Sequence, residues 1–327
     1  MKRNVLYLII LVLLSVIVYF LYIKKEASPY SKNEANFTVE DTAKISQIEL
    51  LDMQGHYIKL QRTTQGWTLN DSLTPRPDAI QSILETLHLQ APEQTVPASY
   101  HDNVIKALSG QHIKVKIFDG EKLTHSFYVA QYPGVNNATY MLNENAQQPF
   151  IVKKPLSNDF LGVRFFTSLQ DWRDKRLFYS TEDIEKVKVQ YTDSLQYSFT
   201  LLANNNSVQN DLGNAQPANA KFVQSYIQSL SKIYCIGFEN TNMQKDSIIH
   251  YGKSLATVTI KHKNEPSHIL TLYFRPIDKG TKAQIKIDGR NYDFDSFFGY
   301  YDQKDFVLIN RKTAEKILRS YPEFLKP

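Results

Sequence analysis

The chain has 327 residues, of which 42% are hydrophobic and 22% are charged, and its formal net charge is +5. This balance is typical of a folded protein and excludes a disordered or fibrous chain, and the length indicates about two domains. Cys235 is the one cysteine in the sequence. A single cysteine excludes an internal disulfide, CxxC redox chemistry and a zinc cluster held by several cysteines.

Positive charge is concentrated near the N-terminus. Residues 1–26 hold four basic residues against one acidic residue, whereas the rest of the chain holds 34 basic and 32 acidic residues. A folded nucleic-acid-binding domain carries a basic stripe or patch. The near balance of charge beyond residue 26 therefore argues against nucleic acid as a partner.

Residues 5–23 (VLYLIILVLLSVIVYFLYI) form an uncharged apolar segment. As a helix it would span about 28 Å, close to the hydrocarbon core of a bilayer. We predict a transmembrane helix over residues 5–23 that anchors the chain in the lipid bilayer, a cytoplasmic tail over residues 1–4 and a polar tether over residues 24–36. The alternative is a cleaved signal peptide, which has a shorter apolar region ending in small residues. This segment instead ends at Lys24 and Lys25.

Charge also indicates the orientation of the predicted span. Two basic residues lie on each side of it, and the initiator amine adds positive charge on the N-terminal side. Positive flanks stay in the cytoplasm, so this small excess favours a cytoplasmic N-terminus. Because no second long apolar run follows, we expect a single-pass protein of the cytoplasmic membrane whose bulk is periplasmic or extracytoplasmic.

An internal repeat organises the rest of the chain. Residues 80–87 carry the apolar i, i+3, i+4, i+7 stripe of an amphipathic helix. The same stripe recurs 143 residues further on, in residues 223–230. The two stripes consist of Ile80, Ile83, Leu84 and Leu87, and of Val223, Tyr226, Ile227 and Leu230.

The segments around the two stripes follow one order. Three short strand-like segments precede each stripe, and a predicted strand hairpin follows it. The first hairpin turns at Asp119-Gly120, and the second turns near Asn264-Glu265. Further strand-like segments follow at residues 139–142 and 150–152 in the first half, and residues 283–289 and 306–309 match them in the second half. Each half ends in a predicted helix, at residues 156–170 and at residues 311–319.

This order predicts an α+β fold. Hairpin connections produce antiparallel sheets, against which the predicted helices pack. We therefore expect two repeated units, residues 37–178 and residues 179–327, each an antiparallel sheet packed with helices.

Several short motifs make the chain similar to a bacterial family, domain of unknown function 4340. They are Trp67-Thr-Leu, the run Asp171-Trp-Arg-Asp-Lys-Arg-Leu-Phe178 and Tyr251-Gly252, together with the N-terminal anchor and tether. The first half differs from the family, because Leu108-Ser-Gly110 stands where Tyr-Gly is expected. The resemblance implies a membrane-anchored extracytoplasmic protein of the bacterial inner membrane, often encoded near ABC-type transporter components, and it supplies no catalytic residues.

The sequence lacks the common catalytic and nucleotide-binding motifs. It contains neither GxGxxG nor GxxxxGK[ST] nor GxSxG, and its histidines form no HExxH. We therefore predict no catalytic residue, no cofactor, no nucleotide and no metal site. Cys235 stands among apolar neighbours and is expected to be buried and inert.

Two features could hold a metal ion, but simpler interpretations are preferred. His262 and His268 flank a predicted turn and are expected to face the solvent. The acidic stretch from Asp288 to Asp295 offers oxygen ligands but lacks the spacing of a calcium-binding EF-hand loop. A hairpin turn at Asp288-Gly289 accounts for that stretch without an ion.

The densest aromatic stretch is residues 292–306 (YDFDSFFGYYDQKDF). Phe294 and Phe306 are expected to lie in the core. Four further rings surround Gly299 in a predicted loop, and two interpretations stay open for them, a protein interface or the core. These candidate interface residues are Phe297, Phe298, Tyr300 and Tyr301.

A charged run marks the predicted junction between the two units. It could bind a partner, or it could be a solvated face whose ion pairs hold the units in register. The candidate junction residues are Trp172, Arg173, Asp174, Lys175 and Arg176.

Together these features predict a non-enzymatic accessory or interaction module of a cell-envelope complex. Its expected partner is an envelope protein, and the resemblance implies ABC-type transporter subunits. Two alternatives stay open: a module that binds an envelope glycan or a small ligand, and a hydrolase whose site has no recognisable motif.

Overall fold

The computed structural model describes residues 12–14, 19, 34–178, 184–230, 232–263, 266–277 and 284–326. Within these residues no helix is long and apolar enough to cross a membrane. Of the predicted span 5–23 the structure describes only residues 12–14 and 19, and of the predicted tether only residues 34–36, so both predictions lie largely outside the described residues.

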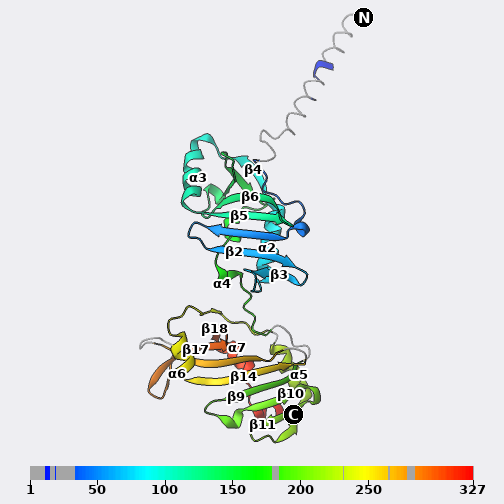
Figure 1. Cartoon of the computed structure of the whole chain (residues 1–327), viewed down its shortest axis with the longest axis vertical. Helices are drawn as coiled ribbons and strands as arrows, with labels where there is room; N and C mark the ends of the chain where they lie inside the picture. The colour runs from blue at the N-terminus through cyan, green and yellow to red at the C-terminus, as the bar shows by residue number, and fades with distance from the viewer. Residues whose placement is uncertain are drawn as a thin grey trace, which may run out of the picture. The chain divides into compact units, whose positions relative to one another are not determined.

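The chain divides into two compact units, Met1–Asp174 and Lys175–Pro327, here called unit 1 and unit 2. The division lies four residues before the predicted boundary at residue 178. Each unit holds one large antiparallel sheet packed with helices (Figure 1). The predicted α+β class, with two antiparallel sheets, is confirmed.

The sheet of unit 1 has the strand order β3-β2-β1-β5-β6-β7-β8-β4. All its neighbouring strands run antiparallel, and the predicted hairpin turn at Asp119-Gly120 joins β5 to β6. The strands are β1 (Gln47–Asp52), β2 (Tyr57–Thr63), β3 (Gly66–Leu69), β4 (Ala91–Thr95), β5 (His112–Asp119), β6 (Lys122–Ala130), β7 (Thr139–Asn143) and β8 (Phe150–Lys153).

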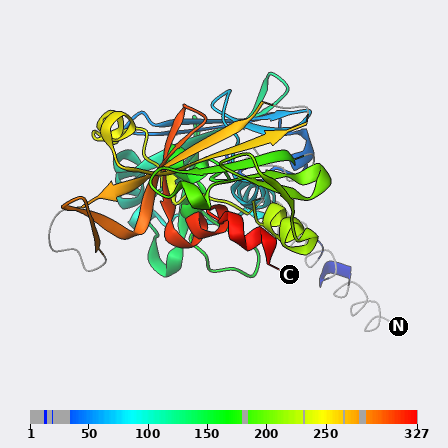
Figure 2. The same ribbon diagram turned by 90° about the horizontal axis from the view of Figure 1, so that it is seen from below.

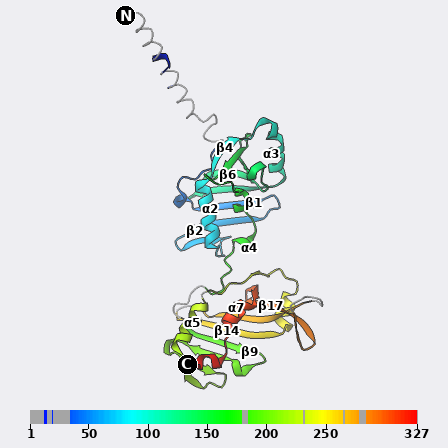
Figure 3. The ribbon, with the colours of Figure 1, turned by 180° about the vertical axis from the view of Figure 1, so that it is seen from behind.

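Helix α2 (Pro77–Leu89) packs on one face of this sheet, as Figure 3 shows. Its sequence favours a helix start, because Pro77 has no N–H to leave unsatisfied and Asp78 lies in the positive first turn. The predicted stripe is confirmed: Ile80, Ile83 and Leu87 are buried in the main core of the unit. Helix α3 (Ala98–Gly110) covers part of the opposite face, beside β6 (Figure 1), with a smaller core of its own.

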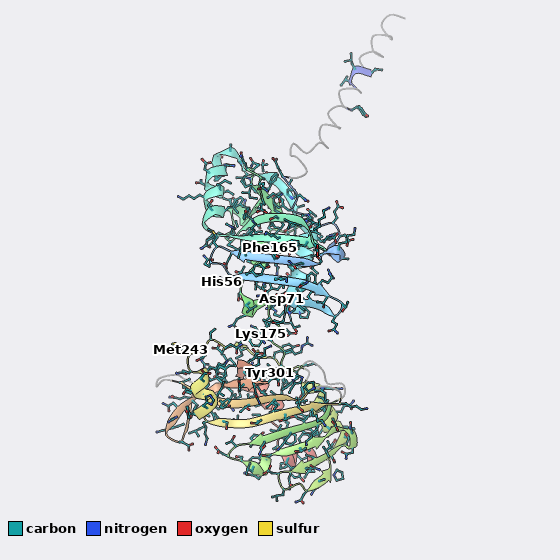
Figure 4. The ribbon with its side chains drawn as sticks, viewed as in Figure 1. His56, Asp71, Phe165, Lys175, Met243 and Tyr301 are labelled. Carbon is teal, nitrogen blue, oxygen red and sulfur yellow. The ribbon has the colours of Figure 1, made fainter. Side chains whose placement is uncertain are left out.

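The helix predicted over residues 156–170 is wrong. The structure has a short 3-10 turn, η3 (Leu161–Arg164), and a one-turn helix, α4 (Leu169–Trp172). Leu156 has a left-handed φ of 59°, and a Cβ on Gly162 would lie 2.7 Å from the Ala130 carbonyl oxygen. Close packing against β6 therefore overrides the local preference for a helix. Phe165, buried against the strands of unit 1 (Figure 4), lies in this irregular segment.

The sheet of unit 2 has the order β12-β11-β10-β9-β14-β15-β17-β18-β13, and β16 pairs with β17 beside this path. The strands are β9 (Ile184–Tyr191), β10 (Phe199–Leu202), β11 (Ser207–Asn210), β12 (Ala215–Pro217), β13 (Gly237–Phe238), β14 (Ser254–His262), β15 (His268–Pro276), β16 (Gln284–Ile287), β17 (Arg290–Tyr301) and β18 (Asp305–Asn310). The predicted turn at Asn264-Glu265 lies outside the described residues.

Helices of unit 2 take the places of those in unit 1. The helix α5 (Ala220–Leu230) begins 143 residues after α2, and its stripe is likewise buried. Short α6 (Lys245–Tyr251) covers the opposite face of the sheet, as α3 does in unit 1. The C-terminal α7 (Arg311–Ile317) and the 3-10 turn η6 (Tyr321–Leu325) lie along one side of the strands, coloured red in Figure 2.

The two sheets share strand order and register. With β12 and β16 set aside, each strand of unit 1 has a counterpart at the same place in unit 2. Ile48 of β1 faces Ile117 of β5, and Val187 of β9 faces Ile260 of β14 in the same way. The predicted order of three strands, a helix, a strand hairpin and further strands is thus present in both units. One predicted match is wrong, since the counterpart of β7 is the second half of β17 and not residues 283–289.

Candidate functional site

The four candidate interface residues lie in strand β17, not in a loop. Phe297 and Phe298 are buried, whereas Tyr300 and Tyr301 are half-buried. Between these two pairs of rings, Gly299 occupies the core position that Met141 fills in β7. A Cβ at Gly299 would lie 2.9 Å from Val307 Cγ2, so the absent side chain lets the strand pass through a full core.

The rings on the other face of β17 form the small core under α6. Phe298 stacks on Phe306 at 4.8 Å between ring centroids, with Ile248 of α6 and Tyr273 in the same cluster. Phe306 therefore lies in the core, as predicted. Phe298 is buried and is not presented on the surface of unit 2.

Phe294 is exposed, against the prediction that it lies in the core. The guanidinium of Arg311 stands 3.7 Å from the Phe294 ring centroid, and its Nε donates a hydrogen bond to the Phe294 carbonyl oxygen. At the end of β17, Tyr301 (Figure 4) donates a hydrogen bond to the Leu177 carbonyl oxygen and stacks against His268.

The predicted junction residues divide between the two units. Trp172 is fully buried in unit 1, stacks on Phe166 at 4.4 Å and donates its Nε1–H to the Phe166 carbonyl oxygen. Asp174 is also buried.

Beyond the division, Lys175 and Arg176 belong to unit 2. The Lys175 carbonyl oxygen accepts a hydrogen bond from the Cys235 N–H, and Arg176 forms a β-bridge with Tyr234. The charged run is therefore divided: Trp172 belongs to the core of unit 1, and Lys175 and Arg176 are the first residues of unit 2.

His262 is buried, so the prediction that the histidine pair faces the solvent is wrong. The rings of His262 and His268 do meet across the hairpin, 5.7 Å apart, and His268 Nδ1 lies 2.7 Å from an Asp302 carboxylate oxygen. Within the described part of the chain no group of three or more His, Cys, Asp or Glu side chains could hold a metal ion. Cys235 is buried, as expected.

The acidic stretch contains a hairpin turn, as predicted. Asp288 and Gly289 adopt positive φ values of 49° and 79° between β16 and β17. The Asp293 carboxylate accepts hydrogen bonds from two backbone N–H groups and pairs with Arg275 at 3.2 Å. These partners account for Asp293 without an ion.

A groove of about 590 Å³ in unit 1 is the strongest candidate site. It runs between α2 and the outer edge of β3, and its wall is predominantly apolar. The groove is lined by Thr42, Gln65, Gly66, Trp67, Thr74, Pro75, Pro77, Ile80, Gln81, Leu84, Glu85 and His88. We call it the α2–β3 groove.

Local structure positions the groove's apolar side chains. Ile80 and Leu84 are one turn apart on α2 and therefore lie on the same helix face. Trp67 is half-buried on β3, and the Arg62 guanidinium stands 4.6 Å from its ring centroid. This cation–π contact holds the indole at the rim of the groove.

Polar groups flank the apolar wall. Gln65, Gln81 and His88 are exposed, and Glu85 forms an ion pair with Lys154 at 2.5 Å. The hydrogen bond from Lys154 lowers the pKa of Glu85. The Glu85 side chain is therefore an anion at neutral pH at this side of the groove.

Backbone groups are available along the β3 edge. The N–H and C=O of Leu69 exchange hydrogen bonds of 2.7 and 2.9 Å with Leu73, on the side away from β2. Backbone groups alternate sides along an antiparallel strand, so Trp67 directs its N–H and C=O to that same outer side. No described residue hydrogen-bonds to these two groups of Trp67.

The sequence places Trp67 in a family motif and in the third strand-like segment before the first helix stripe, and it does not predict the groove. A usable signal is present, because Leu84 belongs to the apolar stripe of its helix and a tryptophan begins the strand-like segment that precedes this helix. What was missing is the distance between those two segments, which only the fold supplies.

Comparison of the chain with family models, with curated proteins and with solved structures gives no match. The resemblance to domain of unknown function 4340 therefore stays a prediction.

Proposed function

We propose that this protein is a non-enzymatic interaction module of a bacterial cell-envelope complex that binds a protein partner in the α2–β3 groove of unit 1. Residues 5–23 anchor it in the inner membrane, and both units lie outside the cytoplasm. One observation carries the proposal: an apolar groove beside a half-buried tryptophan and a strand edge with free backbone groups.

The lining of the groove favours a protein partner over a glycan. Leu84 and Trp67 are half-buried and keep apolar surface in contact with water, and covering that surface with another apolar surface lowers the free energy. A glycan needs polar partners for its many hydroxyl groups, whereas the wall of this groove is predominantly apolar. Protein interfaces instead combine a central aromatic or aliphatic anchor with a polar rim, which is the arrangement found here.

The family resemblance supports the identity of the partner. It implies ABC-type transporter subunits, so these are the proteins that we expect the module to contact. The groove itself supports the class of interaction and not the name of the partner.

Cross-linking in intact cells tests the proposal. The full-length protein is tagged, cross-linked, extracted from membranes and analysed by mass spectrometry, alongside Gln81→Trp and Leu123→Ser. Gln81 is exposed inside the groove, so a tryptophan there fills the groove without disturbing the core. Leu123 is an exposed apolar residue outside it.

We expect cross-links to an envelope protein to fall about tenfold in Gln81→Trp and to stay unchanged in Leu123→Ser. Equal cross-linking in both variants and the natural chain would exclude the groove as the interface. Absence of any specific cross-link from the folded, membrane-inserted protein would count against an interaction module altogether.

A fusion experiment tests the proposed orientation. Alkaline phosphatase, which is active only outside the cytoplasm, is joined after residue 36. We expect high phosphatase activity in the membrane fraction. Activity confined to a cytoplasmic reporter at the same position would reverse the proposed topology.

A further inference from the structure

We infer that the partner binds the α2–β3 groove as an extended peptide that adds to β3 as an extra strand and inserts an apolar side chain between Trp67 and α2. This inference rests on the proposed function and specifies how the partner is recognised. It follows from a comparison of the two units, because unit 2 covers the equivalent strand edge with its own chain.

The equivalent positions are set by strand pairing. Leu69 of β3 pairs with Leu60, and Val208 of β11 pairs with Leu201, with all four side chains fully buried. The next strand pairs have the same register: Leu60 of β2 pairs with Ile48 of β1, and Leu201 of β10 pairs with Val187 of β9. Leu69 and Val208 therefore occupy the same place in the two sheets.

Unit 2 extends its sheet beyond that place. Strand β12 pairs with β11 over three residues, with Gln216 opposite Val208. Pairing continues one step further, since the Ala218 N–H donates to the Asn206 carbonyl oxygen at 2.7 Å. Asn206 lies two residues before Val208, as Trp67 lies two residues before Leu69.

Unit 1 stops short of the same extension. Leu73 alone bridges to Leu69, in the position that Gln216 takes in unit 2. Two residues later, Pro75 stands where unit 2 has Ala218, and proline has no N–H to donate. Pro75 instead forms a β-bridge with Arg173. The chain thus turns away and leaves the Trp67 N–H and C=O at the edge.

The edge and the groove together define the ligand. An extended peptide can exchange two hydrogen bonds with Trp67, as Leu73 does with Leu69. Alternate side chains of that peptide point to opposite faces of the sheet, so one set faces the apolar wall formed by Ile80 and Leu84. The groove therefore selects a segment with a large apolar or aromatic side chain flanked by residues that tolerate solvent.

Peptide selection on the full-length protein tests this inference. Linear heptapeptides from a displayed library are selected on the protein in detergent micelles, with Gln81→Trp as the counter-selection and Leu123→Ser as the control. The best binder is then synthesised as a series in which one backbone nitrogen at a time is methylated. Affinities are measured by calorimetry, and exchange of the Trp67 amide proton is followed with and without peptide.

Strand addition predicts a pattern of alternation. Methylation of the nitrogen that faces Trp67 should lower affinity about tenfold or more, and methylation of its two neighbours should have less than about a threefold effect, because neighbouring N–H groups point away from β3. Bound peptide should also slow hydrogen exchange of the Trp67 amide about tenfold. Gln81→Trp should lower the affinity for the peptide about tenfold or more.

The outcomes separate the two proposals. Peptides that require an open groove but show no methylation pattern and no protection of Trp67 would overturn strand addition and leave the groove as a binding site. Failure to obtain any peptide that discriminates Gln81→Trp from Leu123→Ser would overturn both.

Discussion

Gly299 allows strand β17, which carries the densest aromatic stretch, to pack closely against the neighbouring core side chains of unit 2. Its neighbours Phe297 and Val307 are both buried, and Val307 lies where a side chain at position 299 would project. A glycine weakens a strand interior by its conformational freedom. Here the close approach of Val307, Ile309 and Leu270 requires it.

We expect Gly299→Ala to destabilise unit 2 by about 1–3 kcal/mol, the usual effect of overpacking a filled core. Gly110→Ala is the matched control, because no atom lies within 4 Å of a Cβ at that helix end. Urea denaturation of both variants measures the difference in free energy of unfolding. A loss no larger than that of Gly110→Ala would show that the core has room at position 299.

His125 makes the stability of unit 1 depend on pH. Burial lowers its pKa, against the opposing effect of the hydrogen bond to the Thr38 carbonyl oxygen. Because a carbonyl only accepts, the ring donates from Nε2, and the lowered pKa keeps the ring neutral in the folded protein at pH 7. The unfolded chain, whose histidine has a pKa of about 6.5, takes up the proton first as the pH falls.

The free energy of unfolding should therefore decrease as pH falls from 7 through 6.5 toward the lowered pKa of His125. His101 has a raised pKa and contributes in the opposite direction, so the test is the difference between the natural chain and His125→Gln. Denaturation at pH 7 and pH 5 should show a smaller loss in His125→Gln. Identical losses would mean that His125 is as easily protonated in the folded state as in the unfolded state.

At the scale of elements, each unit closes its core helix with one aromatic residue from its C-terminal turn. The Arg76 N–H at the start of α2 donates to the Trp172 carbonyl oxygen at 2.7 Å, and the Asn219 N–H at the start of α5 donates to the Phe324 carbonyl oxygen at 2.9 Å. Both rings are fully buried. The short turns α4 and η6 are thus equivalent.

Removal of either ring should destabilise only its own unit. We expect Trp172→Ala and Phe324→Ala each to lower the free energy of unfolding by about 3–5 kcal/mol, because a large buried ring leaves a cavity. The neighbours Leu169 and Leu325 are partly exposed, and their alanine variants should change it by less than about 0.5 kcal/mol. Residue-resolved hydrogen exchange shows which unit each substitution destabilises. Equal acceleration of exchange in both units would contradict the expectation that each ring stabilises only its own unit.

At the scale of the whole molecule, the chain builds two separate cores. Among the described residues, the main core of unit 1 draws on residues between Phe37 and Trp172, and that of unit 2 on residues between Leu177 and Phe324. Residues 34–174 of unit 1 and residues 175–327 of unit 2 number 141 and 153, lengths that support independent domains.

Separate expression of residues 34–174 and 175–327 should therefore yield two folded proteins. Each fragment should show a cooperative thermal transition, and its amide spectrum should overlay the corresponding part of the full chain. A fragment without a cooperative transition would show that its core depends on the other unit.

Much of the fold could be predicted because local periodicity is shared by both units. The helix stripe at Ile80 and Val223, and the turn at Asp119-Gly120, depend on neighbours within a few residues. The burial of Phe297 could not be predicted in this way, because it depends on the pairing of β17 with β15 and β18, which places Phe297 opposite Phe274 and Ile309.

Hydrophobic periodicity is encoded locally, so it was sufficient to predict the α+β class, the repeated order of strands and helix, and the buried faces of α2 and α5. Which strand edges are covered, and where a groove lies, depends on contacts between segments that are distant in the sequence. Pro75 and Ala218 illustrate the reason. Each residue lies shortly before a helix in the sequence, and nothing nearby marks it as special. In the folded sheet, however, Pro75 has no N–H to donate to the Trp67 carbonyl oxygen, whereas Ala218 donates its N–H to Asn206.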